Sequence, residues 1–175
     1  SYLPGRALLS CPTKMDTHSG VNVAEKTLYW EDLTLGRTWT ARQSAPITTQ
    51  QIIAFAAEYD PLDMHMDPDL ARASPLGVHC ASGIQTFAIS QRLMCDALLL
   101  QTHVVAGGKI DGVRMVAPVV AGDRLELSTQ VVRSVPHSRD PGRGWVTFKV
   151  EVATAEGKTV LLYEVTVLVL RDGPG

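Results

Sequence analysis

Cysteine is scarce in this sequence, and its thiols fit no common motif. The chain of 175 residues has three cysteines, Cys11, Cys80 and Cys95, and no two of them have the CxxC spacing of a redox or metal-binding motif. Because an odd number of thiols cannot pair completely, we expect a protein of the reducing cytoplasm. The cysteines are then interpreted as structural or incidental.

Strong charge bias and long apolar runs are also missing. The formal net charge is −2, so the basic excess that nucleic acids or anionic membrane surfaces attract is absent, and neither is an expected partner. No apolar run reaches the roughly 18 residues that a membrane-spanning helix needs. The composition, with 45% apolar and 19% charged residues, is that of a globular protein with a substantial core.

The composition divides the chain into one domain with two extensions. Residues 1–25 are rich in Ser, Thr, Gly and Pro, so we expect a flexible N-terminal extension. Residues 26–171 are expected to form a single domain, and residues 172–175 a short tail. One hypothesis is that Met15 is the true translation start, because no secretory or transit pattern precedes it. Mass spectrometry of the native protein would test this, and a mature chain containing the preceding residues would contradict it.

Two helices are expected in the first half of the domain. Thr48 and Gln51 have the spacing of a capping box, which predicts a helix over residues 49–59. Pro61 ends it, because proline disfavours helical geometry in the residue before it. Asp67 can cap a short second helix whose first position is a proline.

A longer helix follows. Ser82 and Gln85 repeat the capping-box spacing and predict a helix over residues 83–100. Its charges are limited to Arg92 and Asp96, and apolar side chains cover most of its circumference. We therefore expect this helix to be buried on nearly every side.

The last third of the chain has the alternating pattern of β-strands. Strands are expected at residues 113–119, 125–135, 145–153 and 159–170, with a short extended segment at 37–45. Long strands joined by short turns form antiparallel sheets. The sequence therefore predicts an α+β fold in which an antiparallel sheet of five or six strands wraps one central helix.

The stretch between these helices contains the side chains that are suited to acid/base chemistry. Asp60 follows the first helix and His65 lies five residues later; a neighbouring carboxylate and imidazole can hold a water molecule and move its protons. From the residues alone, a turn aspartate before proline and a surface histidine are the simpler interpretation. The Asp63-x-His65-x-Asp67 spacing also suggests a metal site, but no second histidine lies at ligand spacing, so we do not expect one.

The start of the long helix is the second candidate feature. Its first N–H groups have no acceptor within the helix and lie at the positive end of the helix dipole. Gly83 allows a ligand oxygen to approach this backbone closely, although a glycine there can equally serve tight helix–sheet packing. Ser82 is interpreted as a cap rather than a nucleophile, because no Gly-x-Ser-x-Gly elbow surrounds it.

Together these segments resemble the MaoC-like dehydratases, the family that includes (R)-specific enoyl-CoA hydratases. The hydratase motif Asp-x-Asn-Pro-x-His-x-Asp is matched by residues 60–67, with Leu62-Asp63 in place of Asn-Pro. The family's Ile-Ala-His-Gly helix start corresponds to residues 80–83, with Ser82 in place of histidine. Downstream, residues 113–123 resemble the Arg-x-x-x-Pro-Val-x-x-Gly-Asp segment. The resemblance spans about residues 29–170.

The resemblance implies a fold, a reaction and a set of site residues. The fold is the hot-dog fold, which pairs as a homodimer or a higher homo-oligomer with active sites near the interface. The reaction is the reversible hydration of a 2-enoyl thioester, expected to be an acyl-CoA, without a separate cofactor. Asp60 and His65 would be the acid/base pair and the Gly83 N–H the oxyanion donor; Ser82, Met64 and Arg114 would contact the substrate.

Two other functions remain open at this point. A hot-dog acyl-CoA thioesterase would use the same helix start, with an activated water attacking the thioester carbonyl. A non-catalytic acyl-CoA-binding subunit would keep the fold without the chemistry.

Overall fold

The computed structural model describes residues 25–173, and these form one curved sheet with a long helix against it. The elements are the 3-10 helix η1 (Trp30–Asp32), β1 (Thr38–Arg42), α1 (Thr49–Tyr59), α2 (Asp63–Met66), α3 (Pro68–Ala73), α4 (Gly83–Ala97), the 3-10 helix η2 (Leu99–Gln101), β2 (Val104–Met115), β3 (Leu125–Pro136), β4 (Arg143–Thr154) and β5 (Thr159–Leu170). Met15, Cys11 and nearly all of the expected N-terminal extension lie outside the described residues.

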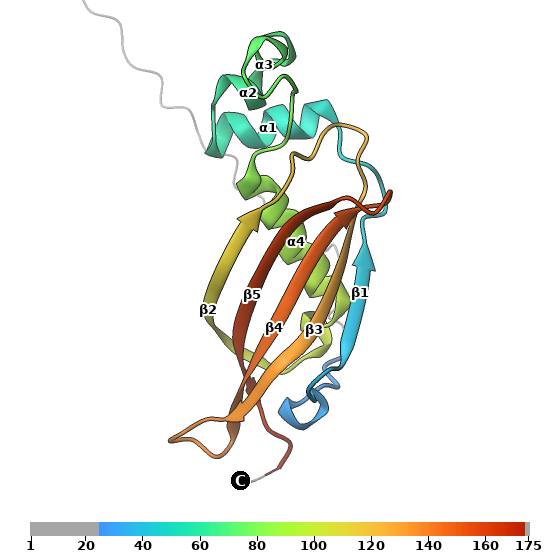
Figure 1. Cartoon of the computed structure of the whole chain (residues 1–175). Coiled ribbons are helices and arrows are strands. Elements are labelled where there is room, and N and C mark those ends of the chain that lie inside the picture. The colour runs from blue at the N-terminus through green and yellow to red at the C-terminus, as the bar shows by residue number, and fades with distance from the viewer. Residues whose placement is uncertain (1–24, 174–175) are drawn as a thin grey trace, which may run out of the picture.

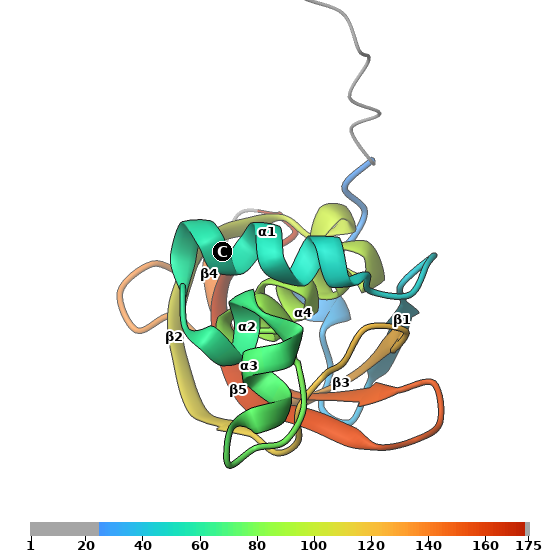
Figure 2. The same cartoon turned by 90° about the horizontal axis from the view of Figure 1, so that it is seen from above.

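The sheet has five strands in the order β1-β3-β4-β5-β2, and every neighbouring pair is antiparallel. It curves around α4, while α1, α2 and α3 gather at one end of the sheet (Figure 1). Seen from that end, the three short helices lie over the start of α4 (Figure 2). The predicted α+β architecture, an antiparallel sheet wrapped around a central helix, is confirmed.

The inner face of the sheet is the one that the alternating pattern predicts. In β3, the expected inner residues Leu125, Leu127, Thr129 and Val131 are buried, while Ser128, Gln130 and Val132 are exposed. In β4, the fully buried side chains are Val146, Phe148, Val150 and Val152. Together with Leu93, Met94 and Leu98 of the helical side, these residues make one continuous core.

The predicted strand over residues 113–119 is wrong in its bounds. The strand β2 runs from Val104 to Met115, and the chain leaves the sheet where the prediction continues it. Every residue of β2 after Val104 is exposed, so no alternation marks the strand. Three register shifts against β5 and the glycines Gly107, Gly108 and Gly112 disturb the pattern further.

The central helix is shorter and more exposed than predicted. It ends at Ala97 and is followed by the 3-10 turn η2. One stripe of α4 faces solvent, with Ile84, Ala88 and Gln91 exposed, so the expectation of burial on nearly every side is wrong for this face. Among residues 25–173, no helix combines the length and hydropathy needed to cross a membrane.

The first helix matches its prediction residue for residue. The Thr48 hydroxyl accepts from the Gln51 N–H at 3.2 Å, and the Gln51 side-chain oxygen accepts from the Thr48 N–H at 2.9 Å. Both bonds of the predicted capping box are therefore present. This cap fixes the start of α1, the helix that ends at Asp60.

Replacing the cap tests this account of α1. Thr48→Ala should lower the free energy of unfolding by about 1 kcal/mol, because it leaves a helix N–H without its acceptor. Thr49→Ala is the matched control: it removes the same side chain one residue later, inside the helix, where alanine is favourable. Urea unfolding monitored by circular dichroism measures both, and equal losses would contradict the capping role.

Candidate active site

The end of α1 and the start of α4 are joined by one short hydrogen bond. Asp60 is the C-cap of α1, and its N–H donates to the Ala56 carbonyl at 2.9 Å. Ser82 is the N-cap of α4, fully buried, and its hydroxyl donates to Asp60 Oδ2 at 2.6 Å. The same hydroxyl accepts from the Ile84 N–H at 3.2 Å. Ser82 therefore caps its own helix and holds the Asp60 carboxylate at the helix start.

The predicted capping box between Ser82 and Gln85 is wrong. The Ser82 hydroxyl accepts from residue 84 rather than residue 85. The Gln85 side chain is turned toward α1, where its Nε2 donates to the Gln51 carbonyl at 3.0 Å. The glutamine thus connects two helices instead of closing back on its own helix start.

His65 lies on a single helical turn, α2, rather than on the loop that the sequence suggests. Its side chain is buried, with 6% of the residue exposed, so it is not a surface histidine. Its Nδ1 lies 2.8 Å from the carbonyl oxygen of Cys80. Because a carbonyl can only accept, Nδ1 carries the hydrogen, and in the neutral ring Nε2 keeps its lone pair.

Nε2 of His65 lies 3.5 Å from Asp60 Oδ2. This separation is longer than a good direct hydrogen bond. A water molecule placed roughly 2.8 Å from each atom would bind both at once. The two side chains can therefore hold one water between a carboxylate and an imidazole nitrogen, which is the arrangement that water activation requires.

The other carboxylates near His65 in sequence are directed elsewhere. Asp63 is exposed at the start of α2. Asp67 caps α3, where Oδ1 accepts from the N–H groups of Asp69 and Leu70 at 2.7 and 3.1 Å. Among the described residues, no group of three His, Cys, Asp or Glu side chains is placed to hold a metal ion. Asp60 is the carboxylate that the fold brings to His65.

Two neighbouring side chains, those of His79 and Cys80, lie close to the histidine turn. Nε2 of His79 lies 2.9 Å from the carbonyl oxygen of His65. The Cys80 Sγ lies 3.9 Å from His65 Nδ1, a pair that resembles a cysteine nucleophile with its base. However, burial raises the pKa of the Cys80 thiol, and Nδ1 already bonds the Cys80 carbonyl. A thiolate nucleophile is therefore not favoured here.

A groove of about 430 Å³ opens beside the histidine and the helix start. Its lining includes Met64, His65, Gly83, Thr86, Met115 and Val160. Gly83 is the first residue of α4, so its N–H has no acceptor within the helix. The groove therefore brings together His65, the helix start and Met64, three of the features that the sequence suggested.

Arg114 is not brought to this groove. It is exposed on β2, and the following residue, Met115, lines the groove in its place. Sequence reasoning missed Met115, Thr86 and Val160 as lining residues. For Met115 the signal was available, because successive residues of a strand face opposite sides and Arg114 and Met115 cannot both face the groove.

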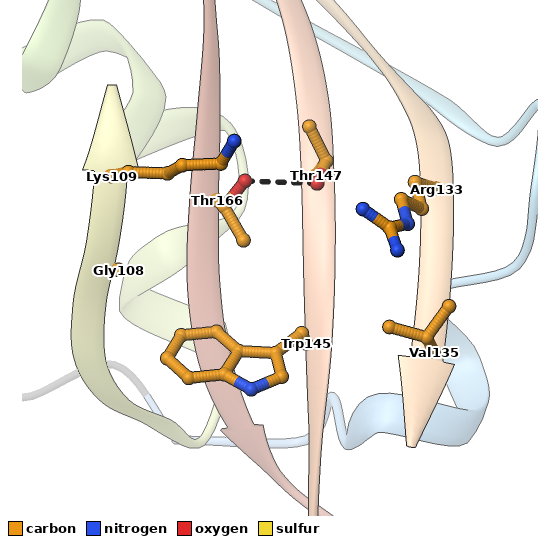
Figure 3. Close-up of a pocket in the computed structure, with 7 residues that line it drawn as sticks. All are labelled: Gly108, Lys109, Arg133, Val135, Trp145, Thr147 and Thr166. Carbon is orange, nitrogen blue, oxygen red and sulfur yellow. Dashed lines mark hydrogen bonds between the residues drawn. The ribbon is translucent and has the colours of Figure 1, made fainter. Parts of the chain in front are cut away.

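A second hollow lies on the outer face of the sheet and is separate from the site (Figure 3). Its lining includes Trp145, Thr147 and Thr166, with Lys109 and Arg133 at its sides. Trp145 and Thr147 alternate along β4 with the core residues Val146 and Phe148. This hollow of about 310 Å³ shares no lining residue with the groove at His65.

Comparison with known proteins finds a matching family model and similar proteins. Residues 32–154 match the family model described as "MaoC like domain". A Bacillus subtilis protein, the uncharacterized protein YdeM, is 28% identical over 143 residues, which cover 81% of this chain and 98% of that protein. The crystal structure of a MaoC-like dehydratase from Rhodospirillum rubrum has a TM-score of 0.78 and 30% identity, covering 85% of this chain and all of that one.

A more distant structure shows the same fold. A Mycobacterium tuberculosis protein described as having a double hotdog fold is 20% identical, with a TM-score of 0.72. The match covers 85% of this chain but 46% of the other, about one half of a double fold. The five-stranded sheet around α4 is thus a single hot-dog fold, as the family resemblance implies.

The bond between Ser82 and Asp60 makes a testable contribution to stability. Ser82→Ala should lower the free energy of unfolding by about 1.5–3 kcal/mol, the range for a hydrogen bond to a charged group. Ser90→Ala is the control: it removes a buried serine of the same helix whose hydroxyl lies 2.8 Å from that of Tyr163. The neutral bond should contribute less, about 0.5–1.5 kcal/mol. Denaturant unfolding compares the two, and a larger loss for Ser90→Ala would contradict the importance of the Asp60 contact.

Proposed function

The chain belongs to the MaoC-like domain family, and from this premise we propose that it is a hydro-lyase acting on 2-enoyl thioesters. It reversibly hydrates an enoyl-CoA to the 3-hydroxyacyl-CoA. The observation that carries the proposal is the arrangement of Asp60 and His65, 3.5 Å apart, beside the start of α4. The relative from R. rubrum, itself described as a MaoC-like dehydratase, supports the same class of reaction.

Hydration of an enoyl thioester makes two demands of a protein. A water must lose a proton while its oxygen bonds to C3, and C2 must receive a proton. Meanwhile negative charge develops on the thioester oxygen and must be stabilised. Positioned acid/base groups typically contribute about 10²–10⁴-fold, and a backbone donor at the developing oxyanion contributes on the order of 10²–10³-fold.

Asp60 and His65 are suited to the first demand. A water bound to both Asp60 Oδ2 and His65 Nε2 gives up a proton to the pair as its oxygen attacks C3, and the pair returns a proton to C2. The Nδ1 bond to the Cys80 carbonyl fixes the ring with Nε2 toward Asp60. Ser82 holds the carboxylate in place through its 2.6 Å hydrogen bond. Both groups are thus oriented before the substrate arrives.

Gly83 is suited to the second demand. Its N–H is the first donor of α4 and lies at the positive end of the helix dipole, where an oxyanion is stabilised. The groove along Met64 then receives the acyl thioester. The reaction needs no bound cofactor, because coenzyme A enters as part of the substrate.

The exposed edge of the sheet supports a homodimer. Among residues 25–173, β2 is an edge strand, and no described strand pairs with its outer side, which leaves backbone groups there for a further strand. Ile110, Val113 and Met115 on this strand are 49%, 43% and 53% exposed, and Ile84 of α4 is 56% exposed. We propose that a second copy of the chain covers these apolar side chains.

The mass in solution tests this dimer. Light scattering coupled to size exclusion should give twice the 18.9 kDa of one chain. Val113→Lys should shift the protein toward the monomer, because it would bury an unpaired charge at the interface. Val132→Lys, on the outer face of β3, is the control and should leave the dimer intact. A monomeric wild-type protein would contradict the proposal.

Substitution of the acid/base pair tests the proposed chemistry. Asp60→Asn and His65→Ala should each lower the hydration rate of crotonyl-CoA by about 10²-fold or more, because either change removes one partner of the water. Asp63→Asn is the matched control, since this exposed carboxylate has no part in the proposed chemistry, and its activity should stay close to that of the wild type. Loss of enoyl absorbance measures the rate. Wild-type turnover in either variant would refute these roles.

The same assays separate the two other functions. Release of free thiol from acyl-CoA, with the enoyl absorbance unchanged, would identify a thioesterase. Binding of crotonyl-CoA and of longer and branched enoyl-CoAs without any hydration would identify a non-catalytic subunit.

A further inference from the structure

The side chain of Met115 lies directly against Gly83, the proposed oxyanion donor. A β-carbon placed on Gly83 would lie 2.7 Å from the Met115 methyl carbon and 3.2 Å from its Cγ, and the sulfur is in contact with it as well. Non-bonded contacts of a β-carbon are essentially never shorter than 3.0 Å, so any side chain at position 83 would require Met115 to move. From standard backbone geometry, the Met115 methyl group is within about 5 Å of the Gly83 nitrogen.

Met115 is the last residue of the edge strand β2, and 53% of it is exposed in the single chain. The second copy proposed above would cover this side chain and limit the positions open to it. Met115 lines the same groove as His65 and Gly83, and it comes from the strand β2.

A thioester bound to the Gly83 N–H would lie close to this side chain. An oxygen accepting from the Gly83 N–H lies about 2.9 Å from the nitrogen. The carbonyl carbon and C2 follow within two bonds of that oxygen. The thioester end of the substrate, including C2, would therefore lie near the Met115 thioether.

We propose that Met115 is a specificity-determining residue that restricts the size of the substituent at C2 of the substrate. Enoyl thioesters with hydrogen at C2 fit beside the thioether, and those with a methyl group at C2 meet it. The inference rests on the proposed function, because it takes the Gly83 N–H as the donor to the thioester oxygen. It assigns to this chain a substrate class, thioesters unbranched at C2, that the acid/base pair alone does not define.

A matched pair of substrates tests the proposal. Crotonyl-CoA and tigloyl-CoA differ by one methyl group at C2, and the ratio of their kcat/KM values is the measurement. One methyl group in a hydrophobic pocket typically changes this ratio about 10–200-fold. The wild type should prefer crotonyl-CoA by a factor in this range, and Met115→Ala should reduce the preference at least fivefold.

Two further variants distinguish shape from other effects. Met115→Leu keeps a side chain of similar volume and should keep the preference within about threefold of the wild-type value. Met66→Ala removes a methionine of α2 that does not line the groove, and the ratio should not change. An unchanged ratio in Met115→Ala would overturn the inference, and so would equal effects of Met115→Ala and Met66→Ala.

Binding separates failure of this inference from failure of the proposed function. Butyryl-CoA and isobutyryl-CoA are saturated, and the second carries the methyl group at C2. Calorimetry should show weaker binding of isobutyryl-CoA to the wild type and a smaller difference for Met115→Ala, whether or not the protein hydrates anything. Equal binding of the two thioesters to the wild type would contradict the role of Met115, whereas normal discrimination without turnover would contradict only the hydratase function.

A double variant tests the contact itself. Gly83→Ala adds a methyl group that must displace Met115. Its effect on the melting temperature should therefore be less favourable in the wild type than in the Met115→Ala background, where the space is free. Equal shifts in both backgrounds would show that Met115 does not occupy the space over Gly83.

Discussion

The site depends on the 2.6 Å hydrogen bond from Ser82 to Asp60. Asp60 ends one helix and Ser82 begins another, and the residues between them carry His65 and its supporting contacts. Without this bond, the carboxylate at the end of α1 would be free to turn toward solvent, since its side chain is already 27% exposed. With it, the carboxylate faces both the histidine ring and the positive end of α4. One serine hydroxyl thus positions a charge, caps a helix and closes the loop that holds the base.

The rest of the fold supports this junction. The curved sheet packs against α4 through β1 and β3. The carbonyl of Cys80, two residues before the cap, orients the His65 ring through Nδ1. The Ala81 N–H donates to the Val119 carbonyl at 2.8 Å, so the segment leading into α4 is bonded to the chain that leaves β2. The helix start, the histidine turn and the strand that carries Met115 are therefore held in one unit.

Local sequence signals correctly predicted the elements that are determined by contacts between residues close in sequence. The Thr48 cap and Pro61 determine α1 from both ends, and the strict alternation of β3 and β4 identified the inner face of the sheet. Prediction failed where tertiary contacts decide. Gln85 has the right spacing for a capping box but bonds Gln51 across to another helix. β2 is all exposed after its first residue, so nothing in its pattern marks it as a strand. The burial of His65 and the contact of Met115 with Gly83 join residues 15 to 32 positions apart, which spacing alone cannot reveal.

The fate of the oxygen of water tests the central claim most directly. If the protein is incubated with crotonyl-CoA in water labelled with heavy oxygen, mass spectrometry reveals which product carries the label. Hydration at the Asp60–His65 pair predicts that the label enters the C3 hydroxyl of 3-hydroxybutyryl-CoA, with the thioester intact. The label in a free carboxylate, together with released coenzyme A, would contradict the account.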